Sequence, residues 1–157
     1  MSEPSHRVVR VDSAADLEAA LAIRQRVFTE EQGIPAELEL DGHDESSYHI
    51  LVLCDDQPVA TGRWREEPVG EADLARIAVV KEHRGKKLSA IVVMELEAWA
   101  RDLGMRRAWL EPHIYLERLY GGLGYHKAGM AAKAGDHQLI RMEKELNGGE
   151  ASNEAQT

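Results

Sequence analysis

The sequence predicts an α+β fold in which helices flank a mixed central sheet. The sheet is expected to be antiparallel in its N-terminal half and to contain one parallel strand–helix–strand crossover. Strand-like runs follow one another over residues 48–80, and a helix-periodic stretch over 88–103 connects the last of them to another strand-like run. The sequence has no run of 18 apolar residues, so no segment is suited to spanning a membrane as a helix.

The length and composition are those of one ordinary globular domain. The chain has 157 residues, close to the roughly 150 of a typical domain, and 43% of them are hydrophobic. We expect one domain over 1–146 and a polar, disordered tail over 147–157. The 28 acidic residues outnumber the 19 basic ones, and the net charge of −9 repels nucleic-acid phosphates and anionic lipids. We therefore expect neither a nucleic-acid nor a membrane partner.

The single cysteine and the N-terminal residues indicate a reducing compartment. Cys54 has no second cysteine with which to form an internal disulfide or a paired-cysteine zinc site. It lies in an apolar run, ILVLC, which is typical of an inert core thiol and not of a nucleophile. Residues 1–10 lack the hydrophobic segment of a signal peptide. These features predict a soluble, cytoplasmic protein.

The first elements are a short strand over 7–11 and a helix over about 14–28. Ser13, followed three residues later by Asp16, has the spacing of a capping box at the start of that helix. Residues 29–47 then follow without periodicity.

This 29–47 segment is rich in carboxylates, and two interpretations stay open. A run of acids is commonly a solvated loop, but a long connection in a compact domain is usually functional or mobile. Its acids are Glu30, Glu31, Glu37, Glu39, Asp41, Asp44 and Glu45.

Three strands follow at 48–54, 59–65 and 73–80, and the tight turns between them predict an antiparallel meander. The apolar end of the third predicts burial on both faces.

The second half contains the crossover. Apolar residues repeat at helical spacing over 88–103, and Gly104 supplies a C-terminal cap. A strand over 107–111 comes next, so the connection should be parallel and right-handed. The remaining elements are a short helix and two strands, at about 114–121, 125–130 and 137–146.

Two segments of this half carry chemistry. Over 77–90 a buried strand runs into a basic, glycine-containing turn that opens a long helix, and the free N–H groups of a helix start attract anions. An ordinary positively charged turn is the alternative. Over 108–125, Tyr120 lies near the end of a short helix, where it either has a functional hydroxyl or fills the core.

In this order and spacing, the two segments resemble the GNAT superfamily of acetyl-CoA-dependent N-acetyltransferases. Residues 84–89 (RGKKLS) fill the frame R/Q-x-x-G-x-G/A of the family's pyrophosphate loop, and 119–125 (LYGGLGY) match its L-Y-x-x-L-G-F signature with Tyr125 in place of the phenylalanine. The resemblance spans about residues 7–146. It implies a GNAT-like sheet and an acetyltransferase that uses acetyl-CoA.

The N-terminal half resembles one branch, the uncharacterised bacterial ElaA/YjcF-type group. The residues that carry this resemblance are Ile23, Arg24, Val27, Phe28, 31–35 (EQGIP), Glu37, Glu39, Asp41, Asp44 and 59–63 (VATGR).

Besides Tyr125, the chain departs from the family pattern at three positions. Lys87 replaces the inner glycine of the pyrophosphate loop, Ser89 replaces a glycine or alanine, and His113 replaces the asparagine or glutamine that often ends the fifth strand. We expect Lys87 to compensate through its charge, because its neighbours mark the loop as anion-binding and a helix tolerates lysine better than glycine.

The resemblance implies a role for each part of the site. The fourth strand would offer backbone groups to the pantetheine and thioester, and the turn would hold the pyrophosphate. The implied cofactor-binding residues are Ile77, Ala78, Val79, Arg84, Gly85, Lys86, Lys87, Leu88 and Ser89.

Tyr120 would protonate the departing thiolate. Its reference pKa of about 10 lies roughly 1.5 units above that of a free thiol, so the transfer would be near balance. The amine must lose a proton, and Glu31, Glu111 and His113 are the candidate bases.

The acceptor is expected to be a primary amine on a small molecule or peptide. The acidic 29–47 segment favours a cationic acceptor. A non-catalytic acyl-CoA-binding or interaction module on the same fold is the alternative, motivated by Lys87 and His113. A homodimer is compatible with the sequence, which does not define an oligomeric state.

Other chemistries lack their motifs. Residues 122–124 (GLG) do not make a dinucleotide fingerprint, because Lys127 stands where the third glycine belongs. The acids and histidines over 41–49 match no recurrent metal-ligand spacing, and we expect no metal. No G-x-S-x-G elbow exists for a hydrolase triad.

Overall fold

The structure is a computed structural model that describes residues 6–134 and 137–146. Its strands are β1 (His6–Arg10), β2 (Tyr48–Cys54), β3 (Gln57–Glu66), β4 (Glu71–Val79), β5 (Arg107–Leu110), β6 (His126–Ala134) and β7 (His137–Glu145). Its helices are α1 (Ala14–Arg24), η1 (Gln25–Glu31), α2 (Ala36–Glu39), η2 (Lys81–His83), α3 (Leu88–Asp102), η3 (Ile114–Leu116) and α4 (Glu117–Gly122).

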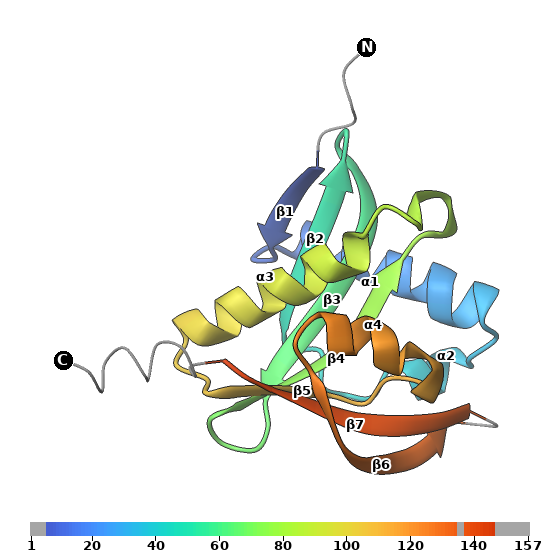
Figure 1. Cartoon of the computed structure of the whole chain (residues 1–157). Coiled ribbons are helices and arrows are strands. Elements are labelled where there is room, and N and C mark those ends of the chain that lie inside the picture. Colours follow the sequence, from blue (N-terminus) through green and yellow to red (C-terminus); the bar gives the residue numbers. More distant parts are fainter. Residues whose placement is uncertain (1–5, 135–136, 147–157) are drawn as a thin grey trace. The chain divides into compact units, whose positions relative to one another are not determined.

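The described strands form one seven-stranded mixed sheet in the order β1-β2-β3-β4-β5-β7-β6 (Figure 1). Helices flank this mixed sheet, so the α+β prediction is confirmed. The main elements follow the predicted order, and the short helices α2 and η2 are additional. The tail predicted at 147–157 lies outside the described residues.

The chain forms two compact units. One consists of Met1–Arg65 and Arg76–Leu96, and the other of Glu66–Ala75 and Glu97–Thr157. Strand β4 and helix α3 each contribute residues to both units. A single domain over 1–146 stays a prediction.

The first unit begins with β1, which pairs antiparallel with β2. The Ser13 hydroxyl then accepts a hydrogen bond from the backbone N–H of Asp16 (3.2 Å) and caps α1, as the sequence predicts. The helix does not end near Phe28. It continues as the π-helix η1 to Glu31, so the helical stretch is longer than predicted.

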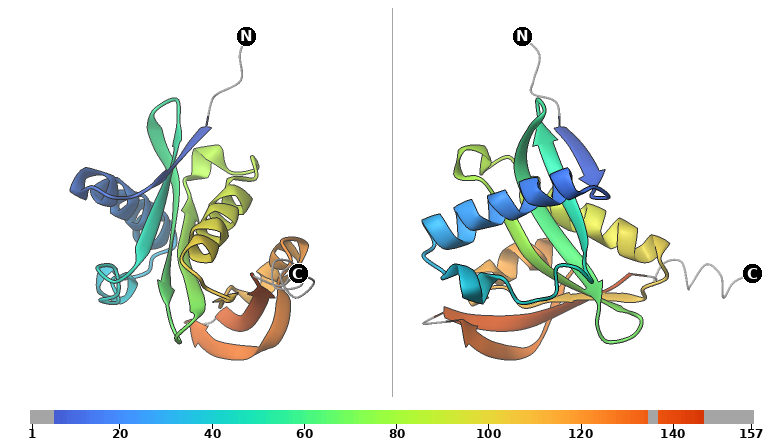
Figure 2. Two further views of the ribbon diagram at one scale, coloured as in Figure 1. Left: turned by 90° about the vertical axis from the view of Figure 1, so that its left-hand side faces the viewer. Right: turned by 180° about the vertical axis from the view of Figure 1, so that it is seen from behind.

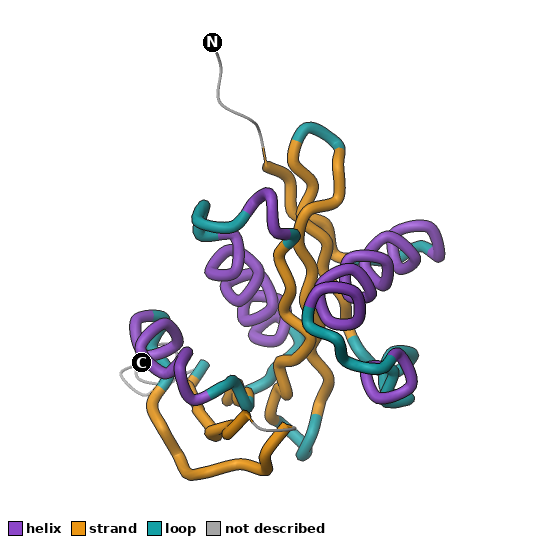
Figure 3. The backbone as a smooth tube through the Cα atoms, turned by 90° about the vertical axis from the view of Figure 1, so that its right-hand side faces the viewer, coloured by secondary structure: helices purple, strands orange, loops and turns teal. Residues whose placement is uncertain are grey.

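Strands β2 and β3 pair antiparallel, as expected for the meander. Gly62 on β3 allows α3 to approach closely, since a Cβ there would lie 2.5 Å from Val92 Cγ1. Helix α1 and the first part of α3 cover opposite faces of β1–β3 (Figure 2, left), and Figure 3 shows the same arrangement from the other side. The core between them includes the buried side chains of Ala20, Ile23, Ile50, Val52, Val92 and Leu96.

The end of β4 is buried less completely than the sequence predicts. Ala78 and Val80 are buried, but Ile77 and Val79 are only half-buried. Burial on both faces is therefore wrong for this segment. The alternation leaves one face of the strand partly accessible at the positions where the resemblance places the cofactor.

The second unit contains the parallel pairing. Ala72 of β4 lies opposite Ala108 of β5 in a parallel register, which confirms the crossover. Strand β7 pairs antiparallel with both β5 and β6. Helix α3 is followed by Gly104 at φ +90°, the left-handed conformation expected of a glycine cap. In the described parts of the chain no helix is long and apolar enough to cross a membrane.

Candidate active site

The turn between β4 and α3 has the backbone conformation of an anion-binding loop. Gly85 has φ +83° and Lys87 has φ +63°, both in the left-handed region. A Cβ at Gly85 would meet no atom within 4 Å, so this glycine is required by its φ and not by crowding. Lys87 adopts the same region at a cost of about 1–2 kcal/mol, which explains why a glycine is common there in the family.

This turn leads into the 15-residue helix α3. The first N–H groups of a helix have no partner within it, and the helix dipole adds positive potential at that end. Leu88 is buried and anchors the helix start, whereas Arg84, Lys86 and Lys87 are exposed. Cationic side chains and helix amides are thus gathered in one segment that can hold a diphosphate.

Arg84 is occupied by a carboxylate from η1. Its Nη1 and Nη2 atoms donate to Glu31 Oε2 (2.5 Å) and Oε1 (2.7 Å), and its Nε donates to the carbonyl oxygen of Val79 (3.0 Å). The hydrogen bond from Arg84 lowers the pKa of Glu31 below its ordinary value. Glu31 is therefore a weaker proton acceptor than an unpaired carboxylate, and it lies beside the turn that precedes α3.

Tyr120 is buried in α4, with 6% of its surface exposed. Its ring packs edge-to-face on Tyr125, with ring centroids 6.0 Å apart. Burial raises the pKa of the Tyr120 hydroxyl to about 12. The near balance with a thiol expected from the reference pKa is therefore wrong for this residue, because its anion is poorly solvated.

Three residues near Tyr120 were missed by sequence reasoning. The Tyr125 hydroxyl donates to Glu97 Oε2 (2.8 Å), and Lys144 Nζ donates to Glu97 Oε1 (2.9 Å) and to the carbonyl oxygen of Leu123 (2.9 Å). Burial and the Glu97 carboxylate raise the pKa of Tyr125. A carboxylate on an otherwise apolar helix face was the available signal. The Tyr125 hydroxyl is engaged by its hydrogen bond to Glu97. Tyr120 is therefore the better candidate of the two tyrosines in the 119–125 motif for a chemical role.

The two candidate bases after β5 have different environments. Glu111 is exposed, while His113 is half-buried and forms an isolated β-bridge with Leu139. The His113 ring lies edge-on to that of His137, with centroids 4.9 Å apart. Its Nδ1 atom is buried and has no hydrogen-bond partner among the described residues. Burial and the nearby His137 lower the pKa of His113, so its imidazole is neutral at pH 7.

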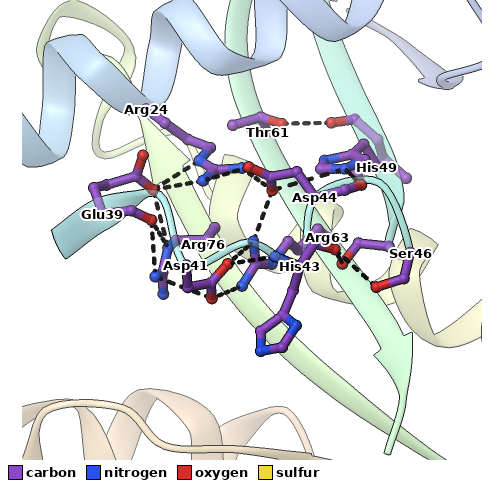
Figure 4. A network of polar contacts seen from close by, with 12 residues as sticks. Arg24, Glu39, Asp41, His43, Asp44, Ser46, His49, Thr61, Arg63 and Arg76 are labelled. Carbon is purple, nitrogen blue, oxygen red and sulfur yellow. Dashed lines mark hydrogen bonds and ion pairs between the residues drawn. The ribbon is translucent and has the colours of Figure 1, made fainter. Parts of the chain in front are cut away.

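Three acids of the 29–47 segment are not free to meet a ligand. Together with three arginines they form a closed, alternating ring of ion pairs (Figure 4). The members of this charge ring are, in order, Arg76, Glu39, Arg24, Asp44, Arg63 and Asp41. The acidic segment is thus neither a solvated loop throughout nor an open cluster of carboxylates.

Comparison with known proteins places this chain. Residues 17–125 match the family model described as the Acetyltransferase (GNAT) family, a span that includes the 84–89 segment, Tyr120 and all six members of the charge ring. The fold and the matched segments define an acetyltransferase. The chain belongs to the GNAT family.

Individual relatives agree with the branch that the N-terminal residues indicate. The uncharacterised N-acetyltransferase YjcF of Bacillus subtilis is 38% identical over 119 residues, which cover 76% of this chain and 84% of YjcF. Two solved structures share the fold over 90% of this chain and 99% of their own. They are an acyl-CoA N-acyltransferase from Pseudomonas aeruginosa (TM-score 0.78, 22% identity) and ElaA from Escherichia coli (TM-score 0.76, 23% identity).

Proposed function

We propose that this chain transfers an acetyl group from acetyl-CoA to a primary amine by direct attack of the amine within a ternary complex. The observation that carries the proposal is the left-handed, cationic turn at the start of α3, within the part of the chain that matches the GNAT family. We place the activity in one domain over 1–146 and in the cytoplasm.

The cofactor would be held by two consecutive segments. The backbone N–H groups of Gly85–Ser89 would bind the pyrophosphate, with cationic side chains nearby. The pantetheine would lie along the strand segment Ile77–Val79, on the face that carries the half-buried side chains of Ile77 and Val79. A backbone N–H near Val79 would donate to the thioester oxygen as negative charge develops on it during attack.

Tyr120 would assist the leaving group. With a pKa of about 12, its hydroxyl lies roughly 3.5 units above a free thiol, so complete proton transfer to an ordinary thiolate is uphill by about 5 kcal/mol. A hydrogen bond that stabilises the developing negative charge on sulfur needs no complete transfer. We therefore assign Tyr120 as a hydrogen-bond donor to the sulfur that releases its proton late.

We propose His113 as the general base. A general base must be unprotonated, and the lowered pKa of His113 keeps its imidazole neutral near pH 7. Glu31 is held by Arg84 in an environment that makes it a weaker base. Glu111 is the second candidate, because it is exposed just after β5.

The acceptor is proposed to be a small-molecule or peptide amine. Fewer acids of the 29–47 segment can attract a cationic acceptor than its composition suggests. Glu39, Asp41 and Asp44 are already neutralised by the arginines of the charge ring. A preference for a second positive charge on the acceptor would have to come from exposed acids such as Glu37 and Glu45.

A two-part measurement tests the proposal. Acetyl-CoA at 100 times its dissociation constant should stabilise the protein by roughly 2.7 kcal/mol, which is visible as a rise in melting temperature. Release of free thiol from acetyl-CoA should then depend on an added amine from a panel of polyamines, aminoglycosides and lysine peptides.

Each of the two measurements has an outcome that would contradict the proposed function. The absence of a thermal shift at millimolar acetyl-CoA would refute the proposal. Binding without thiol release on any amine would favour a non-catalytic acyl-CoA-binding module.

A further inference from the structure

The charge ring is closed, and every neighbouring pair in it is a hydrogen-bonded ion pair. Arg24 donates to Glu39 (2.8 Å) and to Asp44 (2.7 Å). Arg63 donates to Asp44 (2.7 Å) and to Asp41 (3.1 Å). Arg76 completes the ring by donating to Glu39 Oε2 (2.9 Å) and Asp41 Oδ2 (3.3 Å). Three positive and three negative groups therefore balance.

The ring is buried at its centre and joins four elements. Arg24, Glu39 and Arg63 are 1%, 6% and 3% exposed. They come from α1, α2 and β3, and Arg76 adds β4. Burial raises the pKa of the Asp41 carboxyl, but hydrogen bonds from Arg63 and from the His43 backbone outweigh it and leave that pKa well below its usual value. The Asp41 carboxylate thus stays ionised at neutral pH.

Arg76 differs from the other members in its backbone. Its φ is +56°, in the left-handed region that residues other than glycine avoid. The conformation occurs inside a strand, and the surrounding structure must hold it in place. Arg76 has the contacts for this, because its Nε and Nη2 also donate to the carbonyl oxygen of Glu39 (3.2 and 3.0 Å). Glu39 thus accepts hydrogen bonds from the Arg76 guanidinium through both its backbone carbonyl oxygen and its carboxylate.

The next three residues along the chain are Ile77–Val79, the strand segment proposed to lie along acyl-CoA. A left-handed residue redirects the backbone that follows it, so the φ of Arg76 sets how this segment presents its amides. Residues outside the site that fix such a geometry can affect rate strongly, because misplacement by about 1 Å can cost about 100-fold.

We propose that Arg76 is a positioning residue, which the charge ring holds in its left-handed conformation so that Ile77–Val79 is aligned for acyl transfer. The inference rests on the proposed function. It assigns the acidic 36–44 stretch a role in ordering the cofactor strand, through Glu39 and Asp41. The alternative is a ring that stabilises the fold without affecting the strand edge.

Replacing Arg76 by glycine separates these roles. Glycine accepts φ +56° without strain, while the guanidinium that anchors the position is lost. Glu39 and Asp41 keep one arginine partner each, Arg24 and Arg63, so no carboxylate of the ring is left unpaired. Arg76→Lys retains a cation that can reach Glu39. Asp56→Gly is the matched control, because Asp56 also has a positive φ (+68°) but lies in the β2–β3 turn outside the ring.

Hydrogen exchange of the free protein is the first measurement, and it requires no cofactor. We expect amides in the Ile77–Val80 segment to exchange at least about tenfold faster in Arg76→Gly, with Arg76→Lys and Asp56→Gly within about threefold of the wild type. Unchanged exchange in that segment would overturn the proposal. Equally faster exchange throughout β1–β3 would also overturn it, because it would indicate general destabilisation.

Steady-state kinetics and cofactor binding form the second measurement. We expect Arg76→Gly to lower kcat for acetyl transfer by about 10- to 100-fold, with the Kd of coenzyme A changed less than about threefold. Arg76→Lys should recover most of the rate. Normal kcat in Arg76→Gly would overturn the positioning role. Wild-type protein that transfers no acetyl group would instead refute the proposed function, while the exchange result would still decide whether the ring holds the strand.

Discussion

Arg84 and Glu31 form an ion pair with two hydrogen bonds, which joins the turn before α3 to the end of η1. The two residues are 53 positions apart in the sequence, and both side chains are more than a third exposed. A carboxylate therefore occupies the arginine that the GNAT pattern assigns to a diphosphate. A second ion pair, Arg26 with Glu82, connects η1 to η2, which directly precedes Arg84.

Replacing Glu31 by glutamine should strengthen acetyl-CoA binding. The cofactor must compete with Glu31 for Arg84, and exposed ion pairs are commonly worth about 0.2–1 kcal/mol. We expect the Kd of acetyl-CoA to fall by about two- to fivefold in Glu31→Gln. Isothermal titration at constant ionic strength measures this.

Glu30→Gln is the control for that experiment, since Glu30 is the adjacent exposed acid and its loss changes the net charge equally. It should leave the Kd nearly unchanged. If Glu31→Gln binds acetyl-CoA no better and loses kcat by orders of magnitude, Glu31 is the catalytic base and not a competitor for Arg84.

Replacing Tyr120 by phenylalanine should slow catalysis and leave binding intact. The ring that packs on Tyr125 is retained, whereas the hydroxyl proposed to stabilise the leaving sulfur is lost. We expect kcat to fall about 10²- to 10⁴-fold, with little change in the Kd of acetyl-CoA. Stopped-flow thiol release and titration separate the two quantities. A Phe variant with wild-type kcat would show that Tyr120 only fills the core.

The pH profile of kcat/KM should report His113. His113 acts as a base only when its imidazole is neutral, so kcat/KM should be flat near pH 7 and fall at acidic pH. Burial and His137 lower the pKa of His113, so the fall should begin below its ordinary pKa of 6.5. His113→Gln should lose most of the activity together with this acidic limb.

His137→Gln is the companion variant. It removes a group that lowers the pKa of His113, so the acidic limb should move to higher pH while the plateau is kept. An unchanged limb in both variants would assign the titration to another group, with Glu111 as the next candidate.

Local sequence signals predicted the elements and their order. The Ser13 cap and the Gly104 terminator depend on neighbouring residues, and both occur as expected. Residues 84–89 were recognisable as a candidate pyrophosphate loop for the same reason, because that pattern lies within six consecutive residues. Structural features can be predicted from the sequence where the interacting residues are close together along the chain.

The charge ring could not be predicted in this way. Glu39 lies 15 residues from Arg24 and 37 from Arg76, and an acid-rich run looks the same whether it is solvated or paired. The Glu31–Arg84 pair and the Glu97 cluster likewise depend on tertiary contacts. Pairing of this kind makes Glu31 a weaker candidate base, and it leaves fewer unpaired acids in the 29–47 segment to attract a cationic acceptor.

Lys87 is the residue where this chain departs most clearly from its family, and one expectation about it is wrong. Lysine is not favoured there as a helix former, since Lys87 precedes the first residue of α3 and has φ +63°. Lys87→Gly should therefore raise the free energy of unfolding of the free protein by about 1 kcal/mol. Glycine adopts the left-handed conformation without penalty, and the greater conformational freedom of glycine in the unfolded chain offsets part of that gain. Chemical denaturation measures this change.

The same substitution should weaken acetyl-CoA binding, so stability and affinity should move in opposite directions. The exposed ammonium of Lys87 can attract a phosphate as a point charge, and its loss should raise the Kd by about two- to tenfold with a shallower dependence on salt. Lys87→Gln is the matched variant, because it removes the charge and keeps the backbone penalty. It should lose the same affinity without gaining stability. If Lys87→Gly binds acetyl-CoA more tightly at every salt concentration, the lysine side chain crowds the cofactor, and its charge does not compensate for the missing glycine.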